Sequence, residues 1–109
     1  MKYFCTNDER HGSCYHELQI GRWDGTHWRD GSLFIHDDVL TATGLGKLLT
    51  QCLPHYAYYG PTVITVAEWQ NICQTAARQG GKLPAVIAEA DIWLRQNLGT
   101  ADEFMLLGI

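Results

Sequence analysis

The sequence has no long run of residues of one kind. No stretch approaches the ~20 consecutive apolar residues of a membrane-spanning helix, and the first ten residues, MKYFCTNDER, lack the apolar run of a signal peptide. No two Lys or Arg residues are adjacent, so neither a nucleic-acid-binding surface nor a polybasic membrane anchor is expected. We therefore expect a cytoplasmic protein that binds neither nucleic acid nor membrane.

The four cysteines, at positions 5, 14, 52 and 73, include no CxxC pair. Cytosolic thiols stay reduced, so we expect no disulfides. Cys5, His11, Cys14 and His16 are residue types that bind zinc, but their spacing matches no familiar zinc site. We therefore expect no metal and no other cofactor.

Sequence motifs of the common enzyme classes are missing as well, because the chain has no GxSxG, GxGxxG, P-loop or HExxH sequence. One local candidate is His36-Asp37-Asp38, which could supply a base and two metal-binding carboxylates. Acidic residues just before a helix also suit the positive end of its dipole. The sequence thus predicts a protein that is not an enzyme. A small metal-dependent hydrolase, or a ligand-binding domain, that uses His36, Asp37 and Asp38 is the alternative.

Hydrophobic residues make up 46% of the 109 residues, which is enough for one folded domain over residues 1–109. Strands are expected at residues 2–6, 14–20 and 32–36, after Gly60-Pro61, and at 104–109. The alternation in CYHELQI predicts a strand that is half-buried, with one face in solvent. The continuous apolar run FMLLGI instead predicts a strand buried on both faces in the interior of the sheet.

Three helices are expected from their apolar faces and their end signals. The first carries Leu45, Leu48, Leu49, Cys52 and Leu53 and is closed by Pro54. A capping box, Thr65 to Glu68, starts the second, which places Trp69 in the core and stops at Gly80-Gly81. The third begins at Pro84. The order of these elements predicts an α+β fold, with about three helices packed on an antiparallel or mixed sheet of about five strands.

The segment GRWDGTHWRDGS, residues 21–32, places two tryptophans among residues typical of surface turns. Asp24-Gly25 is a common two-residue hairpin turn, which would let Trp23 pack across the sheet as an ordinary strand residue. Trp23 and Trp28 are five positions apart, so in one regular strand they would face opposite sides. We therefore expect Trp28 to lie off the core as an aromatic anchor for a partner, so that its removal leaves folding nearly intact.

Acidic residues are concentrated in the same part of the chain. The net charge is -4, and residues 1–40 hold seven Asp or Glu against four Lys or Arg. Such an excess favours a basic partner. The expected partner-binding residues are Trp23, Asp24, Trp28 and Asp30, with Asp37 and Asp38 as a second acidic patch.

Residues 44–72, GLGKLLTQCLPHYAYYGPTVITVAEWQNI, resemble a segment of the small cytosolic immunity proteins of bacterial polymorphic toxin systems, including contact-dependent growth inhibition. In these proteins a helix ends at Leu-Pro, a Tyr-Gly-Pro-Thr turn follows, and a Thr-capped helix carries Glu-Trp. The terminal FMLLGI is similar to their closing strand, and the resemblance covers roughly residues 33–75 and the last six.

The resemblance implies a non-catalytic inhibitor that binds a cognate toxin, often a nuclease, and blocks its active site or substrate cleft. A nuclease holds phosphate with basic residues, so an acidic inhibitor gains attraction and fast encounter. Exposed aromatic residues would also suit a homodimer interface.

Overall fold

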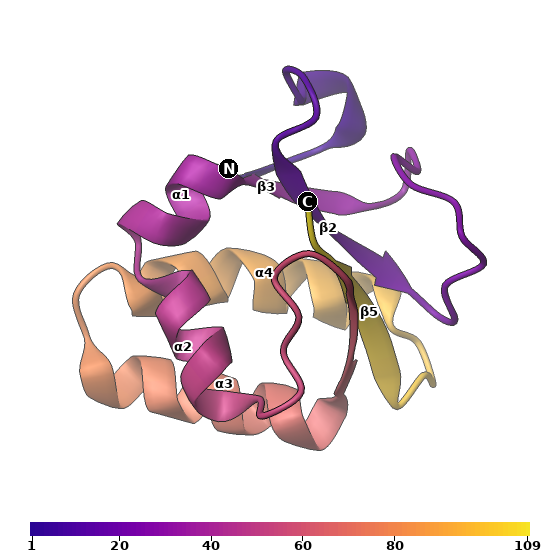
Figure 1. Ribbon diagram of the computed structural model, residues 1–109. Helices are drawn as coiled ribbons and strands as arrows, with labels where there is room; N and C mark the ends of the chain where they lie inside the picture. The colour runs from indigo at the N-terminus through magenta and orange to yellow at the C-terminus, as the bar shows by residue number, and fades with distance from the viewer.

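A five-stranded antiparallel sheet forms the centre of the structure, a computed structural model that describes residues 1–109 (Figure 1). The strands lie in the order β1-β3-β2-β5-β4. They are β1 (Phe4–Cys5), β2 (Tyr15–Ile20), β3 (Leu33–His36), β4 (Pro61–Thr65) and β5 (Glu103–Leu107). The helices are α1 (Asp37–Ala42), α2 (Leu45–Cys52), α3 (Val66–Gln79) and α4 (Leu83–Asn97), and a short 3-10 turn spans Asn7–Glu9. The predicted α+β class is confirmed.

Helices α2, α3 and α4 lie on one side of the sheet and bury its apolar face (Figure 1). The antiparallel register places Leu18 opposite both Leu33 and Leu106, and Ile64 opposite Phe104. All five side chains belong to one core cluster, which the helices complete from the other side. No helix is both long and apolar enough to cross a membrane.

Local signals locate several elements correctly. The capping box forms as expected, since the Thr65 hydroxyl accepts a hydrogen bond from the Glu68 amide and the Glu68 carboxylate accepts one from the Thr65 amide. Strand β5 lies between β2 and β4, which confirms an interior position for the FMLLGI run. The structure adds one helix that the sequence did not predict. Helix α1 has only six residues, too few to show a helical period, and it begins directly after β3 with His36 as its N-cap.

The prediction that β2 is half-buried is wrong. Every residue from Tyr15 to Gln19 is buried, including Glu17 and Gln19, whose side chains are each about 1% exposed. Residues on one face of β2 meet the helices, and residues on the other face are covered by irregular segments of the chain. An alternating pattern reads as one solvated face only when nothing folds back over that face.

Strands β2 and β3 pair with each other, but no tight hairpin turn forms at Asp24-Gly25. They are joined by the irregular segment 21–32, which we call the Trp loop. At the edge of the sheet formed by β1, the N-terminal segment is held by Glu89 of α4. Its carboxylate accepts hydrogen bonds from the backbone amides of Lys2, Tyr3 and Phe4 at 2.9–3.0 Å, which blunts the exposed edge of β1.

We predict that Trp69→Ala lowers the free energy of unfolding by about 3–5 kcal/mol, the range for large aromatic truncations in a core. The Trp69 side chain is buried, its ring packs edge-on against Phe104, and its Nε1 donates to Asp91 at 2.9 Å. Urea denaturation measures the change. Trp69→Phe keeps an aromatic ring beside Phe104 and loses the hydrogen bond and part of the ring volume, so it should cost clearly less. An unchanged midpoint for Trp69→Ala would remove Trp69 from the core.

Candidate functional site

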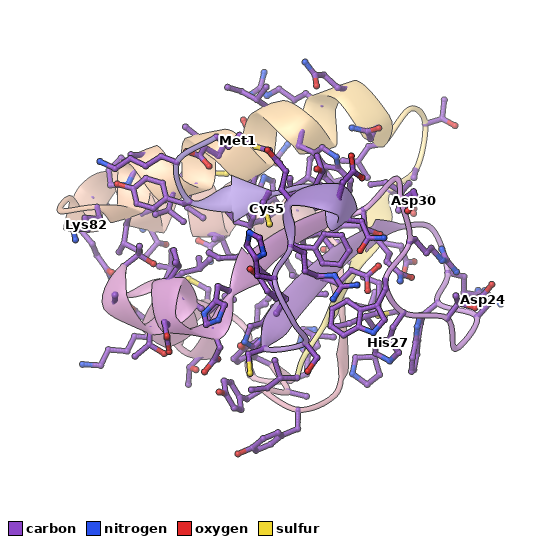
Figure 2. The ribbon with its side chains drawn as sticks, turned by 90° about the horizontal axis from the view of Figure 1, so that it is seen from above. Met1, Cys5, Asp24, His27, Asp30 and Lys82 are labelled. Carbon is purple, nitrogen blue, oxygen red and sulfur yellow. The ribbon has the colours of Figure 1, made fainter.

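The Trp loop covers the sheet face that the helices leave free. Figure 2 shows Asp24, His27 and Asp30 together on one side of the molecule, far from Lys82 in the turn between α3 and α4. Compact surface loops of this length are frequently functional. Two side chains of β2, on the sheet face that the loop covers, fix the conformation of the Trp loop.

Glu17 is the first of these side chains, and its carboxylate is sealed beneath the loop. Oε1 accepts the backbone amide of Trp28 at 2.8 Å, and Oε2 accepts the amide of Arg29 at 3.1 Å. Oε2 also accepts a hydrogen bond from Gln19 Nε2 at 2.8 Å. Hydrogen bonds to an ionised acceptor are about twice as strong as neutral ones. Two consecutive loop amides are therefore fixed to the centre of the sheet.

Gln19 is the second side chain, one pleat further along β2. Its Nε2 also donates to the carbonyl oxygen of Thr26 at 2.8 Å. The same carbonyl accepts the Trp23 indole Nε1–H at 3.1 Å. One buried amide thus links the carboxylate of Glu17 to the middle of the loop.

Trp28 is half-buried and is built into this arrangement. It is the only non-glycine residue with a positive φ, +64°, and its ring stacks on Phe34 with ring centroids 5.9 Å apart. The Arg10 guanidinium lies 4.0 Å from the ring centroid on Trp28, and Asn7 Nδ2 donates to the Trp28 carbonyl oxygen. Trp28 thus lies outside the hydrophobic core, as expected, but its ring contacts both Phe34 and Arg10, so it takes a larger part in the fold than a free anchor would.

Trp23 lies further out on the loop. It is half-buried, and its ring meets that of the exposed His27 edge-on at 5.3 Å. Apart from its indole N–H, it makes no polar contact with its side chain, and it does not pack across the sheet as a strand residue. Of the two loop tryptophans, Trp23 is the one less involved in the fold.

The carboxylates of the loop face solvent. Asp24 accepts the Thr26 amide at 3.0 Å and the Arg29 guanidinium at 2.6 Å. These hydrogen bonds lower the pKa of Asp24 to about 2, and the bond from the Thr26 backbone amide has the largest effect. Asp24 is therefore negative throughout the physiological pH range. Asp30 is exposed and accepts a hydrogen bond from Asn7 Nδ2 at 2.9 Å.

Asp37 and Asp38, expected as a second acidic patch, have different surroundings. The Asp37 Oδ1 lies 2.8 Å from the Nε2 of the fully buried His16 and accepts the Tyr58 hydroxyl at 2.7 Å. The Asp38 side chain is 92% exposed. Asp37 therefore joins β2, α1 and the segment before β4, and only Asp38 presents a free carboxylate.

The alternative hydrolase site does not assemble around His36, Asp37 and Asp38. The His36 Nδ1 accepts the Asp38 backbone amide at 3.0 Å and caps α1, whereas Asp37 is engaged by His16 and Tyr58. No group of three or more His, Cys, Asp or Glu side chains is placed to hold a metal ion. All four cysteines are free thiols.

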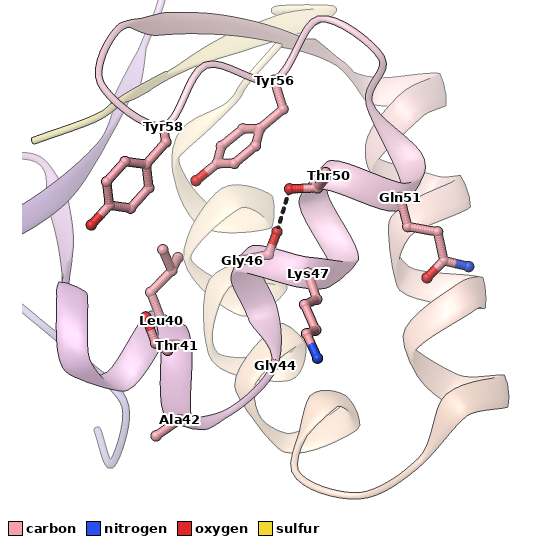
Figure 3. A pocket seen from close by; sticks show the side chains of 10 residues that line it. All are labelled: Leu40, Thr41, Ala42, Gly44, Gly46, Lys47, Thr50, Gln51, Tyr56 and Tyr58. Atoms are coloured by element: carbon pink, nitrogen blue, oxygen red, sulfur yellow. Dashed lines mark hydrogen bonds between the residues drawn. The ribbon is translucent and has the colours of Figure 1, made fainter.

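An open groove of about 700 Å³ lies between α1, α2 and the segment before β4 (Figure 3). Its walls include Tyr56, Tyr58 and Lys47, and the Thr50 hydroxyl donates to the Gly46 carbonyl oxygen within α2. Burial raises the pKa of Tyr56 to about 12, and its hydroxyl has no hydrogen-bond partner. The hydrogen bond to Asp37 raises the pKa of Tyr58 to about 12 as well. Both hydroxyls therefore remain protonated at neutral pH and offer no base.

Comparisons with protein-family models, with curated proteins and with solved structures found no match. The function is therefore inferred from the surfaces described above. Sequence reasoning missed Glu17, Gln19, Asn7 and Arg10, which shape the loop. The one available signal was that Glu17 and Gln19 share a face of the strand that directly precedes the loop.

We predict that Trp28→Ala costs at least about 2 kcal/mol of unfolding free energy, because it removes the ring that contacts both Phe34 and Arg10. Trp23→Ala should cost less than about 1 kcal/mol, as for residues outside the packed core. Thermal or urea unfolding of both variants measures the difference. Equal losses would contradict the distinct places of the two tryptophans.

A second prediction concerns how the Asp37 carboxylate affects the stability of the fold at low pH. The hydrogen bonds from His16 and then Tyr58 hold the pKa of Asp37 below its ordinary value of 3.8. Asp37 thus contributes stability that is present above that value and is lost as the pH falls through the lower folded-state pKa. Tyr58→Phe should raise the folded-state pKa of Asp37 toward its ordinary value, so that the stabilising contribution becomes smaller and is fully lost at a higher pH.

A carboxyl-carbon NMR titration of Asp37 measures this shift directly. Tyr59→Phe is the matched control, because the Tyr59 side chain is 79% exposed and does not bond to Asp37. Identical Asp37 titrations in Tyr58→Phe and the unmodified protein would contradict the assignment.

Proposed function

We propose that this protein is a non-catalytic immunity protein, which binds a cognate basic toxin in the bacterial cytoplasm and blocks its active site or substrate cleft. The observation that carries the proposal is the outer side of the Trp loop. There the rings of Trp23, His27 and Trp28 form an aromatic row in the same loop as the exposed carboxylates of Asp24 and Asp30, on a backbone held in one conformation.

Such a surface has the composition of a protein-binding hot spot, in which aromatic side chains fill a pocket inside a polar rim. Ordering a flexible loop costs free energy on association, and a loop that is already fixed avoids that cost. Trp23 supports the proposal as the anchor more strongly than Trp28, since less of its side chain is used by the fold. Trp28 contributes the remaining open part of its ring.

The charges support a basic partner. Asp24 keeps its negative charge at any physiological pH, and Asp30 and Asp38 are exposed. Carboxylates of this kind can pair with the Lys or Arg residues by which a nuclease holds phosphate. The net charge of -4 also favours attraction at a distance. Asp37 supports this surface indirectly, because its carboxylate is engaged inside the fold.

The experiment is growth rescue. The chain is co-expressed with the polypeptide encoded by the adjoining reading frame, and growth and complex formation are measured. Rescue together with a stable complex is expected. Growth arrest that the chain does not relieve, or relief without any complex, would contradict the proposal.

Variants then locate the surface. Trp23→Ala should weaken the complex by about 2 kcal/mol or more. The double variant Asp24→Asn/Asp30→Asn should mainly slow association, most clearly at low salt. Gln70→Lys/Gln74→Lys on the exposed side of α3 changes the net charge by the same amount away from the loop and is the matched control. Binding unchanged by both loop variants would place the interface elsewhere.

A further inference from the structure

We infer that Glu17 is the positioning residue of the Trp loop: its buried carboxylate holds the loop in the conformation that binds the partner. The inference rests on the proposed function of the loop. Glu17 itself is beneath the loop and about 1% exposed, so it reaches no partner and acts only through the backbone above it.

The geometry is that of an anion held by consecutive amides. The amides of Trp28 and Arg29 both point at one carboxylate, each to a different oxygen. Neighbouring amides converge in this way when one residue takes the left-handed conformation, as Trp28 does with φ +64°. Such an arrangement of amides, called a nest, can bind an external anion, whereas here the chain supplies the anion from its own sheet.

Because the Glu17 carboxylate is buried, it is stable only while its hydrogen bonds to the loop are made. A carboxylate removed from water is strongly destabilising unless its oxygens are hydrogen-bonded. Its donors are the amides of Trp28 and Arg29 and the amide nitrogen of Gln19, which is itself bonded to Thr26 in the loop. Any loop conformation that moves these two backbone amides away leaves the buried Glu17 carboxylate without most of its hydrogen bonds. The loop conformation in which the Trp28 and Arg29 amides bond to Glu17 is thereby favoured over all others.

The other contacts of the loop hold it less firmly. The ion pair between Arg29 and Asp24 lies at the surface, where such pairs contribute little. The packing of Trp28 on Phe34 holds a ring but does not select a positive φ, which is unfavourable for a residue with a side chain. The bonds to Glu17 hold two consecutive backbone amides at the strained position, whereas Asn7 adds a single bond, to the Trp28 carbonyl oxygen.

The test compares Glu17→Gln with Glu89→Gln. Glu89 is a matched control, because its carboxylate also accepts several backbone amides, but those of residues 2–4 on another side of the fold. Glu17→Gln should speed hydrogen exchange of the Trp28 and Arg29 amides about tenfold or more and weaken toxin binding by a similar factor. Glu89→Gln should leave both unchanged.

A measurement on the unmodified protein keeps the inference testable if Glu17→Gln does not fold. The amides of Trp28 and Arg29 should exchange at least about tenfold more slowly than that of Gly25, which has no partner in the same loop. Equal exchange rates would overturn the inference without any toxin being present.

The binding data separate the two claims. If Trp23→Ala weakens the complex while Glu17→Gln frees the loop and leaves the affinity unchanged, the positioning role is overturned and the proposed function stands. If the loop is released by Glu17→Gln but neither variant alters binding, the interface lies elsewhere and the positioning role is overturned. The proposed function itself fails only if the chain forms no complex or does not relieve growth arrest.

Discussion

One buried carboxylate constrains the whole second face of the sheet. Glu17 lies on β2, the middle strand of the sheet, where it is about 1% exposed and forms no ion pair with a basic side chain. Its hydrogen bonds have to come from backbone amides, and only a loop folded back over the sheet can bring them there. The amides of Trp28 and Arg29 meet that requirement with Trp28 at a positive φ, and Arg10 and Asn7 make further contacts with Trp28.

The opposite face of β2 also carries a buried polar side chain that binds a remote segment of the chain. His16, one residue before Glu17, is fully buried and bonded to Asp37, which also accepts the Tyr58 hydroxyl. Consecutive polar residues of one strand therefore organise irregular chain on opposite sides of the sheet. Polar networks buried in this way specify one arrangement more sharply than apolar packing does, provided that their members are hydrogen-bonded. A surface formed by such segments is already held in one conformation in the free protein.

The sequence predicts the elements whose signals are local and misses the contacts between remote segments. Thr65 and Glu68 start α3, Pro54 follows α2, and the FMLLGI run identifies an interior strand, because each depends on neighbouring residues alone. The cover over Glu17 comes from amides 11 and 12 residues away, and Asp37 meets partners 21 residues away on either side. No local pattern encodes those distances, so the burial of β2 and the place of Trp28 could not be predicted.

The most direct test of the account is an indole NMR titration with the toxin. The four tryptophans report separately, since Trp23 and Trp28 lie in the Trp loop while Trp69 and Trp93 lie in α3 and α4. If the fixed loop is the binding surface, the Trp23 and Trp28 indole signals shift or broaden on addition of toxin, and those of Trp69 and Trp93 stay in place. Shifts confined to Trp69 and Trp93 would contradict the account and move the interface to the helices.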